Sequence, residues 1–147
     1  MAISRVPWHI EIPEGYETEL KDKKKFLQEC MNDMTHTWGS FIRQAVTMNR
    51  YGFSVHEKVY RKRTRASGSK FDDGLIGIKA LPIITQDSIA SWQWSDDGLE
   101  VIGMLQWKNK PAGLRQLVLL TPGQYVPIPR NKYIHFRNNP IKDNPEG

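Results

Sequence analysis

The chain has 147 residues, of which 39% are hydrophobic and 25% are charged, and its formal net charge is +5. These values are those of one ordinary soluble domain with a real core, and they permit a polyanionic partner without requiring one. No apolar run approaches the roughly 18–20 residues that span a bilayer, and the N-terminus lacks the apolar part of a signal peptide. Cys30 is the only cysteine, so we expect no disulfide and no cysteine-based metal site, which suits a reducing cytosol.

The first predicted elements are a short strand at residues 8–12 and one long helix. The helix is predicted to run from an N-cap at Asp22 to about Met48, because apolar residues recur at spacings of three and four. These residues are Leu27, Met31, Met34, Trp38, Phe41, Ile42 and Ala45.

A long strand is predicted next, at residues 51–63. Phe53, Val55 and Val59 alternate with polar residues, so the odd-numbered positions share one face. Helix and strand each present an apolar face, and we expect them to pack on one another. The predicted structural core at this junction comprises Trp38, Phe41, Tyr51, Gly52 and Phe53, with Gly52 at the helix end.

The remainder of the chain reads as strands separated by turns. Residues 64–74 form a polar loop that we expect to be mobile, and the Asp-Asp-Gly turn near residue 97 predicts a β-hairpin. Strands are predicted at residues 75–81, 87–94, 99–107, 115–121, 125–129 and 132–137, with a turn at residues 109–113 and an extended tail at residues 138–147. The two prolines of residues 125–129 suit an edge strand.

The predicted fold class is therefore α+β. One long N-terminal helix packs against a mostly antiparallel β-sheet of about six strands, in a single domain of residues 1–147.

The sequence offers no constellation for catalysis. No two of the four histidines stand at metal-ligand spacing, and the acidic pairs at residues 72–73 and 96–97 each precede glycine, which turn chemistry explains. No nucleophile-elbow, phosphate-loop or dinucleotide motif is present. We expect no catalytic residue, no cofactor and no metal, and thus not an enzyme.

Glu57 interrupts the apolar face of the strand at residues 51–63. A carboxylate there must reach solvent or be paired. One interpretation is that the face is exposed beyond Val55. The other is an ion pair with Arg43 or with a neighbouring subunit.

The end of the same strand is basic, with Arg61, Lys62, Arg63 and Arg65 close together. Such runs are commonly solvated strand ends. The functional interpretation is contact with a nucleic-acid backbone, which arginine and lysine make without sequence specificity.

Four stretches carry a family resemblance, in the same order along the chain. The first is residues 33–60, with Asp33, Met34, Trp38, Met48, Tyr51, Gly52, Phe53, Ser54, Glu57, Val59 and Tyr60. The others are Asp73, Gly74, Ile76, Leu81 and Pro82; then Ile128, Pro129, Arg130, Lys132, His135 and Phe136; then the sequence DNPEG at residues 143–147. Together they resemble the portal proteins of tailed bacteriophages, most closely the branch of Mu-like phages and related prophages.

The resemblance implies a structural subunit of a ring, typically dodecameric, at one capsid vertex of the virion. Its partners would be other portal subunits, the terminase, head–tail connector proteins and phage DNA bound non-specifically, with assembly in the host cytoplasm. The matched segment would belong to the outer, wing-like α+β region. Family chains are far longer and continue into the stem, so we expect this chain to be a partial portal subunit.

A second hypothesis needs no resemblance. The chain would be a free-standing basic module that binds nucleic acid through Arg61, Lys62, Arg63 and Arg65.

Overall fold

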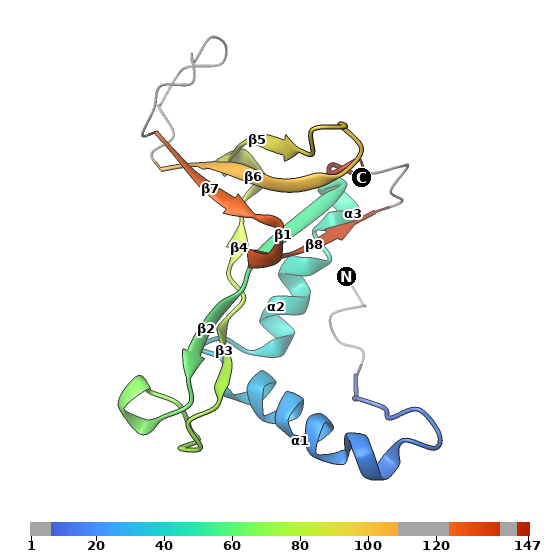
Figure 1. The fold of residues 1–147 in the computed structure, drawn as a ribbon, viewed down its shortest axis with the longest axis vertical. Helices are drawn as coiled ribbons and strands as arrows, with labels where there is room; N and C mark the ends of the chain where they lie inside the picture. The colour runs from blue at the N-terminus through green and yellow to red at the C-terminus, as the bar shows by residue number, and fades with distance from the viewer. Residues whose placement is uncertain (1–6, 109–123, 139–143) are drawn as a thin grey trace. The chain divides into compact units, whose positions relative to one another are not determined.

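The computed structural model describes residues 7–108, 124–138 and 144–147, and the chain forms two compact units (Figure 1). Unit 1 comprises Met1–Val46 and Lys58–Pro82, and unit 2 comprises Thr47–Glu57 and Ile83–Gly147. That residues 1–147 form a single domain remains a prediction, because the division into two compact units does not test it. The predicted α+β class is confirmed, because both helices and antiparallel strands are present.

The prediction of one long helix from residue 22 to residue 48 is wrong. Three helices occupy this stretch: α1 (Glu17–Asp33), α2 (Trp38–Ala45) and α3 (Met48–Tyr51). The chain leaves α1 at Met34, whose backbone is extended. It then re-enters a helix because the Thr37 hydroxyl accepts a hydrogen bond from the Ser40 amide at 3.1 Å, which caps the first turn of α2.

Unit 1 is built on a two-stranded antiparallel sheet of β2 (Val59–Lys62) and β3 (Ile76–Ala80), with α1 lying against β3 (Figure 1). The Thr35 amide donates to the Lys79 carbonyl at 2.9 Å, which ties the end of α1 to the strand. A Cβ on Gly77 would lie 3.0 Å from the Arg63 side chain and 3.5 Å from Cys30 Sγ. Glycine at this position therefore lets the arginine lie flat against the strand.

Unit 2 contains two three-stranded antiparallel sheets. One has the order β4 (Ile83–Ile84), β1 (Phe53–Glu57), β8 (Tyr133–Arg137), and the other β5 (Ile89–Trp94), β6 (Val101–Trp107), β7 (Tyr125–Pro129). Both sheets contribute to one buried core, which comprises Phe53, Val55, Ile84, Met104, Ile128 and Tyr133.

The predicted single sheet of about six strands is also wrong, since the described residues form eight strands in sheets of three, two and three. The strand predicted at residues 51–63 divides at Lys58 into β1 and β2. The two parts have different partners, since β1 pairs with β4 and β8 whereas β2 pairs with β3. Four of the five residues of β1 are buried, whereas β2 alternates half-buried and exposed residues. Residues 8–12 form no strand.

Two local predictions are confirmed. The hairpin of β5 and β6 turns at residues 95–98, with Gly98 at φ +69°. The proline-containing strand β7 pairs only with β6 among the described strands, as expected of an edge. The turn and strand predicted at residues 109–113 and 115–121 lie outside the described residues.

Candidate functional site

Arg63 is the most buried charged residue among those of unit 1 that the structure describes. Its side chain is 1% exposed, and Nη2 lies 2.6 Å from Glu29 Oε2 and 2.8 Å from Asp73 Oδ2. The guanidinium also lies over the rings of Phe26 and Phe71, 4.9 and 4.2 Å from their centroids. Burial lowers the pKa of Arg63, but the hydrogen bond to Glu29 and the charge of Asp73 raise it above its ordinary value. The residue is thus a charged structural clamp between α1 and the loop of residues 64–74.

A second ion pair lies beside the first. Arg61 Nη2 is 2.8 Å from Asp33 Oδ2 and also donates to the Asp33 carbonyl, while Nη1 donates to the Gly68 carbonyl at 3.1 Å. The Ser69 hydroxyl and the Lys70 amide each donate to the Asp33 carboxylate at 2.7 Å. Burial raises the pKa of Asp33, but these hydrogen bonds and the Arg61 charge outweigh it and hold the pKa below its ordinary value.

The four basic residues predicted as a contact surface therefore divide into two pairs. Arg61 and Arg63 point inward and are committed to carboxylates of α1 and the loop, so the proposal that they contact DNA or a neighbouring subunit needs correction. Lys62 and Arg65 are exposed, and their predicted contact role stays a prediction. Alternation along β2 explains why Arg61 and Lys62 face opposite ways; Arg63 follows β2 and is buried, whereas Arg65 begins the 3-10 helix η2 (Arg65–Ser67) and is exposed.

Glu57 ends β1 and is exposed. Within residues 7–108, 124–138 and 144–147, no basic side chain forms an ion pair with it. The solvent-exposed alternative is the one the structure shows, and a contact with a neighbouring subunit stays a prediction.

The predicted core residues have different surroundings. Phe41 and Phe53 are buried, and Trp38 is half-buried, with its ring 4.8 Å from that of Phe41. Tyr51 is 52% exposed, so its assignment to the core is wrong; it ends the short helix α3, where Arg50 lies over its ring. Gly52 has φ +85°, which confirms the prediction of a glycine with positive φ at the end of the helix.

Three of the four stretches that carry the resemblance contribute residues to one cluster in unit 2, whereas the stretch at residues 73–82 lies in unit 1. A Cβ on Gly52 would collide with the carbonyl group of Glu146, so the backbone of residues 144–147 lies directly on Gly52. The Asn138 amide donates to the Gly52 carbonyl at 2.7 Å, and Arg137 donates to the Asn144 carbonyl at 3.1 Å. The described part of the predicted extended tail is thus a turn packed against α3, β1 and β8.

His135 belongs to the same cluster. Its Nε2 is 2.8 Å from the Pro145 carbonyl oxygen, and its ring stacks on Trp92 with centroids 5.1 Å apart and planes at 13°. These contacts give the histidine a structural role.

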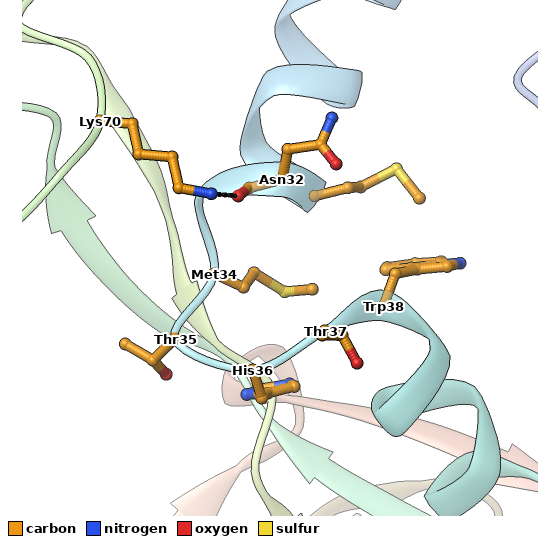
Figure 2. A pocket seen from close by; sticks show the side chains of 8 residues that line it. Asn32, Met34, Thr35, His36, Thr37, Trp38 and Lys70 are labelled. Atoms are coloured by element: carbon orange, nitrogen blue, oxygen red, sulfur yellow. Dashed lines mark hydrogen bonds between the residues drawn. The ribbon is translucent and has the colours of Figure 1, made fainter.

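A hollow of about 320 Å³ lies in unit 1 where α1 ends and α2 begins (Figure 2). Its apolar lining comes from Met31, Met34 and Trp38, and Figure 2 shows Met34 extending toward the side that Trp38 forms. Lys70 brings the one charged group of the lining, and its ammonium donates to the Asn32 carbonyl. We call this feature the α1–α2 hollow; Thr35, His36 and Thr37 complete it.

The sequence did not lead us to predict the buried contacts of Asp33 or the presence of the α1–α2 hollow. One signal for Asp33 was available, because a carboxylate in the last turn of a helix faces the negative end of the helix dipole and needs a partner elsewhere. In the part of the chain that the structure describes, no group of three or more His, Cys, Asp or Glu residues is placed to hold a metal ion. No helix there is both long and apolar enough to cross a membrane.

Comparisons with known proteins identify the family. None of the curated proteins compared with the chain matches it. The family model described as the portal protein of Mu bacteriophage matches residues 1–147, the whole of the chain. The chain therefore belongs to the family of Mu-like phage portal proteins.

Proposed function

We propose that this chain is a structural subunit of the portal ring, the head-to-tail connector through which phage DNA is packaged and ejected, and that it acts without catalysis. The observation that carries the proposal is the family match over residues 1–147. The packing of Gly52 and His135 against residues 144–147 supports it, because these motif residues contact one another as parts of the fold. The proposed partners are other portal subunits, the terminase, head–tail connector proteins and DNA, first in the host cytoplasm and then in the virion.

The test is the position of the protein in virions. An epitope-tagged chain is expressed during growth of the phage that encodes it, and purified particles are labelled with gold-conjugated antibody. A portal subunit is expected to give label at a single vertex beside the tail. Particles without label, or with label over the whole shell, would overturn the proposal. A tagged major capsid protein is the positive control for labelling.

The alternative, a free-standing nucleic-acid-binding module, keeps some support from the exposed cations Lys62 and Arg65. It predicts DNA affinity that falls steeply with salt and that drops in the double variant Lys62→Glu/Arg65→Glu. The matched control is Lys108→Glu/Lys132→Glu, which makes the same charge change at exposed residues of unit 2. Equal affinities for the two double variants would exclude this surface as the DNA contact.

A further inference from the structure

The turn between β5 and β6 carries exposed apolar side chains together with exposed acidic ones. We call residues 95–100 the β5–β6 tip. Leu99 at this tip is 69% exposed, and Trp94 and Ile102 at the adjoining strand ends are 42% and 52% exposed. Asp96, Asp97 and Glu100 are exposed residues of the same tip, and no basic residue occurs between residues 94 and 107.

Hydrogen bonds within the β5–β6 tip order its backbone. The Ser95 amide donates to the Glu100 carbonyl at 2.9 Å, and the Glu100 amide donates to the Ser95 hydroxyl at 3.1 Å. The Leu99 amide donates to the Asp97 carboxylate at 3.0 Å, and hydrogen bonds from Ser95 and Leu99 lower the pKa of Asp97. An apolar side chain displayed on an ordered turn loses little conformational freedom on binding, which favours a protein contact.

The α1–α2 hollow has the complementary properties. Methionine and tryptophan line it, and both are enriched at the centres of protein interfaces, where methionine adapts its shape to a partner. Trp8, which is 48% exposed, extends the aromatic surface because its ring lies 5.3 Å from that of Trp38. The charge of the lining is positive, from the exposed Lys70. An apolar knob with carboxylates beside it is the partner that this lining favours.

We propose that the β5–β6 tip of one copy of this chain docks into the α1–α2 hollow of a second copy, with Leu99 as the apolar anchor and Glu100 or Asp96 facing Lys70. This inference rests on the proposed function and names the contact through which neighbouring subunits would meet. Two different, complementary patches on one chain give a head-to-tail contact, and repetition of such a contact produces a ring or a filament.

The contact is small compared with a stable interface. One hairpin tip buries far less than the roughly 1,200–2,000 Å² of a typical specific complex. We therefore expect it to be weak between two isolated copies and to act as one anchor among the contacts of an assembly. Covalent trapping is accordingly the suitable assay.

The test uses two differently tagged copies of the full chain in a Cys30→Ala background. One copy carries Thr35→Cys in the α1–α2 hollow, and the other carries Leu99→Cys at the β5–β6 tip. Under mild oxidation the mixture is expected to yield a disulfide between the two tags. Val126→Cys is the matched control for the tip, because Val126 is an exposed residue of β7 at 40%.

Several results would overturn the proposal. Cross-linking no faster than with Val126→Cys would show that the tip does not reach the hollow of another copy. Disulfides only between two Leu99→Cys chains would show a tip-to-tip contact. A chain carrying both substitutions that cross-links within itself, independently of concentration, would show that the hollow holds the chain's own tip.

A charge exchange separates docking from damage to the fold. Lys70→Glu in the hollow chain, or Glu100→Lys together with Asp96→Lys in the tip chain, should slow cross-linking about threefold, as an exposed ion pair predicts. Combining the exchanged hollow with the exchanged tip should restore the rate, which a misfolded chain would not do. Lack of restoration, with circular dichroism unchanged, counts against the pairing. Loss of cross-linking with virion vertices still labelled would refute the docking alone, whereas unlabelled virions would refute the portal function.

Discussion

Replacement of Arg63 tests whether packing or charge dominates the clamp in unit 1. Removing one partner of a buried ion pair costs about 3–5 kcal/mol when the other charge is stranded. Here the partner carboxylates reach water, with Glu29 24% and Asp73 37% exposed, so the ionic part is only about 1 kcal/mol. Most of the stability contributed by Arg63 must then come from its packing between the rings of Phe26 and Phe71.

Two variants make this division measurable. Arg63→Ala removes the packing and leaves a cavity, and we expect a loss of about 3–4 kcal/mol in the free energy of unfolding. Arg63→Met keeps a long apolar side chain against the rings and removes two buried nitrogens, Nε and Nη1, that have no hydrogen-bond partner among the described residues. We expect it to cost about 1–2 kcal/mol.

Urea unfolding followed by tryptophan fluorescence measures both losses, with Trp8 and Trp38 reporting on unit 1 and the three other tryptophans on unit 2. Lys62→Ala, at the exposed neighbouring position, is the control and should stay within about 0.5 kcal/mol of the wild type. The reasoning would be refuted if Arg63→Ala also stayed within that range. Equal losses for alanine and methionine would show that charge, not packing, dominates.

Three further substitutions probe other parts of the fold by thermal or urea unfolding. Gly52→Ala should cost about 2–3 kcal/mol because it combines a positive φ with a clash at the Glu146 carbonyl. Gly98→Ala is the control: it has φ +69° and no described atom within 4 Å of the added Cβ, and it should cost about 1 kcal/mol. Equal costs would contradict the packing of residues 144–147 on Gly52. Asp33→Asn should lower the free energy of unfolding at pH 7, and this loss should shrink as the pH falls below the ordinary carboxyl pKa of 3.8. The reason is that a lowered pKa in the folded state gives stability that is present above the unfolded-state pKa and is lost on acidification through the folded-state pKa. A loss that does not depend on pH would count against this reasoning. Thr37→Ala should cost about 1 kcal/mol through loss of the cap on α2, with Thr37→Ser near neutral as its control.

The features predicted from sequence are those set by neighbouring residues. The hairpin at residues 95–98, the positive φ of Gly52 and the edge position of β7 all follow from local turn and proline chemistry. The break between α1 and α2 escaped prediction because apolar residues keep their spacing of three and four through it, from Met31 and Met34 to Trp38. Threonine is a favoured N-cap residue, so the identity of residue 37 did contain a signal for the start of α2.

The site escaped prediction for a different reason. Arg61 and Asp33 are 28 residues apart in sequence, and Arg63 and Glu29 are 34 apart. A basic run beside a loop looks the same in sequence whether its charges are solvated, bound to a polyanion or paired with distant carboxylates. For the basic run itself, the alternation of β2 contained usable information, since it requires Arg61 and Lys62 to face opposite ways.

Asp33 connects the stability of unit 1 with its candidate interface. The Lys70 amide and the Ser69 hydroxyl both donate to the Asp33 carboxylate at 2.7 Å, and the Lys70 ammonium then reaches the Asn32 carbonyl beside the α1–α2 hollow. The positive charge on the wall of the hollow is therefore positioned by the same carboxylate that neutralises Arg61. Asp33 is the last residue of α1, and the next residue, Met34, lines the hollow. The residue that ends the helix therefore also positions Lys70, which gives the lining of the hollow its positive charge. Arg61 thus helps to hold in place the surface that we propose meets a second copy, because it pairs with the carboxylate that accepts the Lys70 amide.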